Sequence, residues 1–140
     1  MGKLFVVFVF LLMGSNALAA ENDFRCLRSV DSKNSIKLQF VFDSEKDGFG
    51  SVVYQKGGKP IPVKRMTEKE LKRGPSGRPS EVEAQWQETT PDGSGGTYVI
   101  VSQGALISKF QYIRKKDGKV FVFEEDMDAT GENGCAWNTK

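Results

Sequence analysis

The residues best suited to chemistry lie between Thr90 and Lys119, where glycine-rich turns alternate with apolar runs. Ser94 and Gly95 belong to one such turn, and Tyr98 follows at the start of the next apolar run. A serine hydroxyl at a loop tip both donates and accepts hydrogen bonds, and glycines let the backbone approach a partner closely. Lys109 adds a positive charge on the following run. This set of residue types is suited to contacting a partner.

Catalysis by the commonest side chains is excluded. The chain has no histidine, which removes the Ser-His-Asp and Cys-His mechanisms and the commonest metal ligand. Hydrolysis by two carboxylates stays open, but no acidic pair stands out in an apolar setting. We find no phosphate-binding, dinucleotide or zinc-protease motif, and we expect no enzyme activity, no cofactor and no metal. Asp126, Asp128 and Glu132 resemble a calcium loop only faintly, and their spacing favours a solvated acidic loop.

The first nineteen residues have the pattern of a secretory signal peptide. Lys3 precedes an apolar run, Leu4 to Met13, that is too short to span a bilayer, and Ala17-Leu18-Ala19 is a small-residue cleavage site. A buried N-terminal helix or strand is the less favoured alternative. We therefore expect a signal peptide over 1–19 and one domain over 20–140, located in the periplasm or secreted, with no stable membrane insertion after cleavage.

The two cysteines, Cys26 and Cys135, lie near the two ends of the expected domain. In an exported protein an even pair predicts a disulfide, which would close almost the whole domain into one loop. Free or metal-binding thiols are the weaker alternative, because there is no CxxC spacing and two thiolates do not complete a zinc site.

The remaining chain is dominated by short segments with the period-two alternation of β-strands. The clearest is Ser35 to Asp43, in which Ile36, Leu38, Phe40 and Phe42 share one face. Asp47-Gly48 then marks a hairpin turn. The other expected strands are Phe24 to Val30, Ser51 to Gln55, Glu81 to Thr89, Thr97 to Ser102, Ala105 to Lys115 and Lys119 to Glu125.

Three segments depart from simple alternation. Pro60 to Met66 carries two prolines, which predict an edge strand or an irregular crossover. Thr67 to Glu70 matches a capping box, which predicts one or two helical turns before the Gly74 to Ser80 loop. The mixed phase of Ala105 to Lys115 predicts a bulge near Ser108-Lys109. The expected fold class is all-β, a small antiparallel barrel or sandwich of about seven or eight strands with at most one short helix.

This layout resembles that of the exported inhibitors with which bacteria resist c-type lysozyme, in their membrane-bound and periplasmic forms. The resemblance rests on Phe24-Arg25-Cys26 at the start, Cys135 near the end, and a central Ser-Gly-x-x-Tyr motif at Ser94, Gly95 and Tyr98. It implies a small disulfide-closed β-barrel. It also implies that Ser94 and Lys109 enter the active-site cleft of a lysozyme-like hydrolase and bind its carboxylates.

Phe110 stands where the family has a glycine, so Lys115 or Lys116 of the neighbouring turn is an alternative lysine. Two other classes of function remain. One is a small β-barrel carrier of an apolar ligand, lined by some of the aromatic residues. The other is an envelope-complex adaptor that uses the stretch from Lys56 to Arg78, which contains eight basic residues and only two acidic ones. Export and the lack of interleaved aromatics argue against nucleic acid as the partner.

Overall fold

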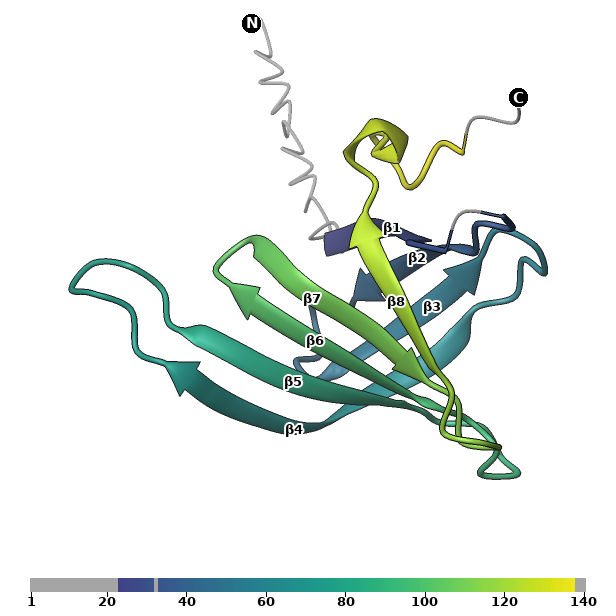
Figure 1. Cartoon of the computed structure of the whole chain (residues 1–140), viewed down its shortest axis with the longest axis horizontal. Helices are drawn as coiled ribbons and strands as arrows, with labels where there is room; N and C mark the ends of the chain where they lie inside the picture. The colour runs from purple at the N-terminus through teal and green to yellow at the C-terminus, as the bar shows by residue number, and fades with distance from the viewer. Residues whose placement is uncertain (1–22, 32, 138–140) are drawn as a thin grey trace, which may run out of the picture.

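The computed structural model describes residues 23–31 and 33–137, and these form one closed antiparallel barrel (Figure 1). Each strand pairs with the next along the chain, and β1 pairs with β8 to close the barrel. The strands are β1 (Asp23–Ser29), β2 (Lys37–Phe42), β3 (Phe49–Tyr54), β4 (Ile61–Lys72), β5 (Glu81–Glu88), β6 (Thr97–Gln103), β7 (Leu106–Ile113) and β8 (Val120–Glu125). The all-β prediction is confirmed, and the alternative between barrel and sandwich is decided for the barrel.

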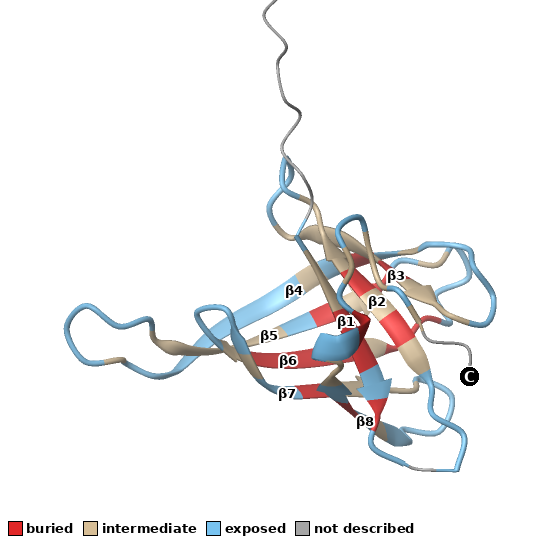
Figure 2. Ribbon diagram, turned by 90° about the horizontal axis from the view of Figure 1, so that it is seen from above, coloured by how far each residue is buried: buried red, intermediate tan, exposed pale blue. Residues whose placement is uncertain are grey.

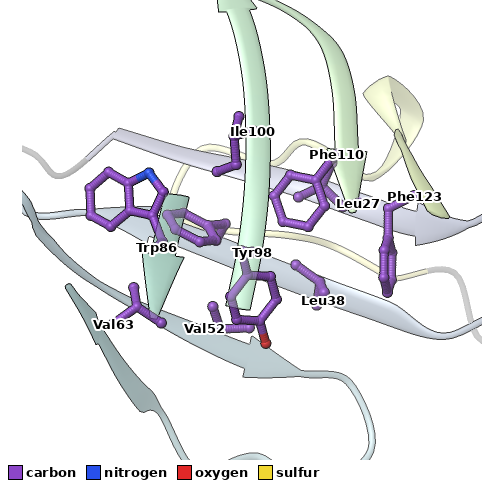
Figure 3. Close-up of a cluster of buried hydrophobic side chains, with 10 residues drawn as sticks. Leu27, Leu38, Val52, Val63, Trp86, Tyr98, Ile100, Phe110 and Phe123 are labelled. Carbon is purple, nitrogen blue, oxygen red and sulfur yellow. The ribbon is translucent and has the colours of Figure 1, made fainter. Parts of the chain in front are cut away.

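Alternation along each strand fills the barrel interior with large side chains. Leu38 and Phe40 of β2 are fully buried, as the period-two pattern predicts, and Tyr98 and Phe110 meet Phe40 from the opposite wall. Figure 3 shows this cluster, in which side chains from all eight strands point toward one another. Its members are Leu27, Leu38, Phe40, Val52, Val63, Trp86, Tyr98, Ile100, Phe110 and Phe123. The interior is therefore a packed core and not an open channel.

The predicted helix at Thr67 to Glu70 is wrong, because β4 runs without interruption to Lys72. Thr67 pairs with Gln85 and Glu70 pairs with Val82 of β5. A capping box supports a helix only through local hydrogen bonds, and here the ladder to β5 satisfies the same backbone groups. Tertiary pairing has overridden a local signal.

The edge-strand prediction for Pro60 to Met66 is also wrong, since Ile61 to Lys64 pair with β3 and from Val63 onward with β5. Pro62 is tolerated because a residue of an antiparallel strand points its nitrogen and its carbonyl to the same side. The Pro62 carbonyl accepts from the Thr89 amide beside the end of β5, so the missing N–H interrupts no bond to β3.

Beyond the closed barrel, four strands continue as an open sheet. From residue 66 onward β4 has no β3 partner, and β7 has no β8 partner before Phe110. We call residues 66–72, 81–85, 99–103 and 106–109 the projecting sheet, which extends to the left in Figures 1 and 2. The predicted bulge is confirmed, because Val101 pairs with Lys109 while Ser102 pairs with Ile107, which leaves Ser108 unpaired.

The chain after β8 is fastened to the outside of the barrel. It makes one 3-10 turn, η1 (Met127–Ala129), and then reaches Cys135, which forms the predicted disulfide with Cys26 of β1. The Cys135 amide also donates to the side chain of Gln39 in β2. The expected signal peptide and the boundary between residues 19 and 20 lie outside the described residues. The disulfide fits a protein of an oxidising, extracytoplasmic compartment.

Candidate functional site

Four loops lie at the end of the barrel where β1, β3, β5 and β7 finish, and we call this the loop end. The loops comprise residues 30–36, 55–60, 89–96 and 114–119. Their described residues carry seven basic side chains against three acidic ones. The basic residues are Lys33, Lys56, Lys59, Arg114, Lys115, Lys116 and Lys119, and the acidic ones are Asp31, Asp92 and Asp117. The outer surface of these loops is therefore complementary to an acidic partner.

Ser94 is exposed at the tip of the loop between β5 and β6, and a local hydrogen-bond network holds it there. Its hydroxyl donates to Asp92 Oδ1 at 2.7 Å, and its amide donates to the same oxygen at 3.1 Å. These bonds lower the pKa of Asp92, and the bond from the Ser94 side chain has the largest effect. The Gly95 amide donates to Thr90 Oγ1 at 3.0 Å. The loop thus has a defined shape before any partner binds.

The two glycines after Ser94 are required because there is no space for a side chain. A Cβ on Gly95 would lie 2.5 Å from the Glu88 Cβ, and one on Gly96 would lie 2.5 Å from the Tyr112 ring. Neither glycine has a positive φ, whereas Gly93 has a φ of 69°. Gly95 and Gly96 therefore bring the loop against the barrel, and Gly93 provides the tight turn before it.

Tyr98 lies inside the barrel and has no exposed surface. Its hydroxyl donates to Glu88 Oε1 at 2.9 Å and lies 2.6 Å from the hydroxyl of Tyr54. Because Glu88 is also the residue against which Gly95 packs, Tyr98 positions the Ser94 loop indirectly. It supports the candidate surface from within and does not reach a partner.

Burial sets the acid-base properties of this internal network. Glu88 is only 8% exposed, and burial raises the pKa of its carboxyl group, while the bonds from Tyr98 and Tyr112 oppose that rise. Burial likewise raises the pKa of Tyr54, of Tyr98 and of Tyr112. All three tyrosines therefore keep their protons at neutral pH. Tyr98 and Tyr112 donate to the Glu88 carboxylate, whereas Tyr54 bonds the Tyr98 hydroxyl.

The structure does not bring Lys109 next to Ser94. Lys109 pairs with Val101, four residues along β6 from Thr97, where the Ser94 loop ends. Four residues of strand span about 13 Å. Phe110 points into the core, so its neighbour Lys109 points outward from the projecting sheet.

Lys115 takes the position beside the loop that the sequence-based interpretation gave to Lys109. Its ammonium group donates to the carbonyl of Gly93, the residue before Ser94. Figure 1 shows the turns after β5 and β7 converging at the lower right. Lys116 is exposed in the same turn. Of the three lysines considered, Lys115 is the one the structure places against the Ser94 loop.

Sequence reasoning missed Glu88. The signal was present, because Glu88 continues the inward phase of Val82, Ala84 and Trp86 along β5. A carboxylate at a core position of a strand requires hydrogen-bond partners, and the tyrosines supply them. No residue spacing indicated that Tyr54 would join this network through the Tyr98 hydroxyl, because it arrives from a distant strand.

Two cavities open at the ends of the packed interior. One, of about 290 Å³, lies at the loop end and is lined by Ile36, Tyr54, Ile61, Glu88, Tyr112, Arg114, Phe121 and Phe123. The other, of about 230 Å³, lies at the opposite end, where Phe42, Trp86 and Ile107 face Arg25 and Arg65. Arg65 is already engaged by Asp47 through two bonds of 2.7 and 3.2 Å.

The basic stretch from Lys56 to Arg78 does not form one surface. Lys56 and Lys59 lie at the loop end, whereas Lys72 ends β4 in the projecting sheet. Within residues 23–31 and 33–137, no three acidic, histidine or cysteine side chains gather to hold a metal ion. The same residues contain no helix with the length and hydropathy needed to span a bilayer.

Comparisons of the chain with protein-family models, with curated proteins and with solved structures find no match.

Proposed function

We propose that this protein is an exported binding protein that inhibits a lysozyme-like cell-wall hydrolase. In this proposal the Ser94 loop enters the hydrolase's active-site cleft. The observation that carries the proposal is the arrangement at the loop tip. Ser94 is exposed on a loop held by Asp92 and Thr90, and the Lys115 ammonium group lies beside it.

The chemistry of the two surfaces is complementary. The cleft of a glycoside hydrolase carries two carboxylates. A lysine pairs with one desolvated carboxylate, and the Ser94 hydroxyl donates to the other by turning from Asp92 to the hydrolase. Because the loop is already ordered by its own hydrogen bonds, little conformational entropy is lost on binding. The surrounding excess of basic residues would also accelerate association with an acidic cleft.

The other two classes of function receive less support. A carrier of an apolar ligand needs an internal cavity, and the interior of this barrel is filled by Phe40, Tyr98 and Phe110. An adaptor that used the basic Lys56 to Arg78 stretch would need those charges on one face, and they are divided between the two ends of the barrel.

The direct test is to titrate the disulfide-bonded mature protein into lysozymes of the hen, goose and invertebrate types while following cell-wall lysis. We expect inhibition of at least one. Lys115→Ala should weaken it roughly tenfold to a hundredfold, because a charge-assisted hydrogen bond is lost. Ser94→Ala should weaken it by about two- to tenfold.

Lys109→Ala is the matched control, since it removes the same charge from the outward face of the projecting sheet. It should leave inhibition unchanged. If none of the three lysozyme types is inhibited, the proposal is wrong. If Lys109→Ala weakens inhibition more than Lys115→Ala, the hydrolase contacts a different surface from the loop tip.

A further inference from the structure

The cavity at the loop end combines an apolar lining with one buried carboxylate. Its lining residues are mostly aliphatic and aromatic, among them Ile36, Tyr54, Tyr112 and Phe121, and Glu88 lines it as well. Its volume of about 290 Å³ is at the lower limit for small-molecule sites. A ligand of this cavity must therefore be small, with an apolar body.

The charge of Glu88 has no cationic partner. Glu88 takes part in none of the ion pairs among the described residues, although only 8% of its surface is exposed. Arg114 lines the same cavity, but its guanidinium is held by Asp117 through bonds of 2.9 and 2.6 Å. A nearby cation favours the ionised form of a buried carboxylate, so this position favours a positively charged ligand.

The aromatic rings of the cavity also favour a positively charged ligand. Tyr112 and Phe121 are neighbours with ring centroids 6.1 Å apart. The ring of Phe121 already attracts two cations, the Arg114 guanidinium at 5.4 Å and the Lys119 ammonium at 5.0 Å. The faces of aromatic rings attract cations and also pack against alkyl carbon. A carboxylate beside such rings is the usual composition of a site for organic ammonium groups.

We propose that this cavity binds an alkylammonium group. The nitrogen lies against Glu88 and accepting hydroxyl oxygens of the tyrosines, and the alkyl carbons pack on Tyr112 and Phe121. An anion would be repelled by Glu88, and a neutral alkyl ligand would leave the carboxylate without a counter-charge. The group belongs either to a free amine or to a lysine side chain of another protein. This site does not depend on inhibition of a hydrolase.

The test is a titration of the wild-type protein with butylammonium at constant ionic strength and about pH 8, far enough above the ordinary glutamate pKa to favour the ionised form of Glu88 despite its raised pKa. The readout is the NMR shift of the Tyr54 and Tyr112 ring signals. We expect saturable binding with a dissociation constant on the order of 1 mM, given five non-hydrogen atoms. 1-Butanol, which has a similar shape and no charge, should bind at least about tenfold more weakly.

Glu88→Gln keeps the shape of the side chain and one acceptor oxygen, and it removes the charge. It should weaken butylammonium binding by about tenfold or more. Glu83→Gln makes the same change on β5 in the projecting sheet and should have no effect. Phe121→Ala, at a partly buried position, should weaken binding by about three- to tenfold and tests the site if Glu88→Gln does not fold.

Titration with Nα-acetyl-lysine amide distinguishes the two sources of the ligand, a free amine and a protein lysine. If it binds as well as butylammonium, the site accepts a protein lysine, and if it does not, the site is restricted to free amines. The proposal is overturned if butylammonium causes no saturable shift at Tyr54 and Tyr112. It is also overturned if 1-butanol binds equally well, or if folded Glu88→Gln binds butylammonium as tightly as the wild type.

Discussion

The two ends of this barrel are built differently. At the loop end all eight strands belong to the closed barrel, and the glycines of the Ser94 loop pack against Glu88 and Tyr112. At the opposite end β4 to β7 continue as the projecting sheet, whose outer strands each lack a partner on one side. Figure 2 shows mostly exposed and intermediate residues along the projecting sheet, where the buried residues are those of β6, Val99 to Val101.

The unpaired edge of β4 shows how an open sheet is protected. Its exposed apolar residues, Met66 and Leu71, both lie at register shifts in the pairing with β5. Bulges and charged side chains discourage a second strand from pairing with an edge, and the remainder of this segment is rich in lysine and glutamate. Stability should therefore come mainly from the closed barrel and the buried base of β6, and the exposed hairpin ends of the projecting sheet should contribute little.

The largest effect should follow loss of the disulfide, which joins β1 of the closed barrel to the chain end across a separation of 109 residues. In the chain-entropy model a loop of this length is worth about 4–5 kcal/mol. We expect the double variant Cys26→Ser, Cys135→Ser to lose about that much unfolding free energy in urea. Wild-type protein in reductant is the control and should lose a similar amount. A loss below about 1 kcal/mol would contradict the entropic account.

Removing one core ring should show most directly how the closed barrel and the projecting sheet differ in their contribution to the free energy of unfolding. Phe40 contacts the rings of Phe42, Trp86, Tyr98 and Phe110. Phe40→Ala should therefore cost about 3–5 kcal/mol in unfolding free energy.

Leu106→Ala is the matched truncation in the projecting sheet, where Leu106 is 65% exposed. It should cost less than about 0.5 kcal/mol. Chemical denaturation of both variants gives the comparison. Equal losses would mean that the projecting sheet is as strongly packed as the barrel.

A smaller effect should follow Gly95→Ala in the Ser94 loop. The added methyl group would overlap the Glu88 Cβ and carbonyl oxygen, so the loop must shift. We expect a loss of about 1–3 kcal/mol, the usual cost of overpacking. Ser94→Ala removes only an exposed hydroxyl and should change stability by less than about 0.5 kcal/mol. If Gly95→Ala were as mild as Ser94→Ala, the close packing of the loop on β5 would be refuted.

The smallest effect should be the pH dependence contributed by Glu88. Its pKa is raised in the folded state, so over the range above the ordinary glutamate value the folded protein keeps a proton that the unfolded chain releases. Stability should therefore fall as pH rises through that range. Urea unfolding of the wild type minus that of Glu88→Gln, measured from about pH 4 to 8, should show this fall.

Glu83→Gln is the control for that measurement and should follow the wild type at every pH. A difference curve that is flat, or that rises with pH, would mean that Glu88 is not destabilised by burial.

Much of the fold was predictable because the signals are local. The alternation of Ile36, Leu38, Phe40 and Phe42 predicted β2, and Asp47-Gly48 predicted the turn that follows. The mixed phase around Ser108 predicted the bulge in β7. The helix predicted after Thr67 failed because a capping box is also local, and local preference was outweighed by pairing with β5.

For the candidate site, the sequence alone determined the type of surface but not its partners. The glycine-rich loop with Ser94 at its tip, the pair of cysteines, and the missing histidine are all properties of neighbouring residues or of composition. Only the tertiary structure decided that Lys115 and not Lys109 lies beside Ser94. The turns after β5 and β7 meet at one end of a barrel, whereas the strand register carries Lys109 about 13 Å away. The tertiary structure likewise surrounded Glu88 with tyrosines from separate strands, because closing a sheet into a barrel joins residues that the chain keeps far apart.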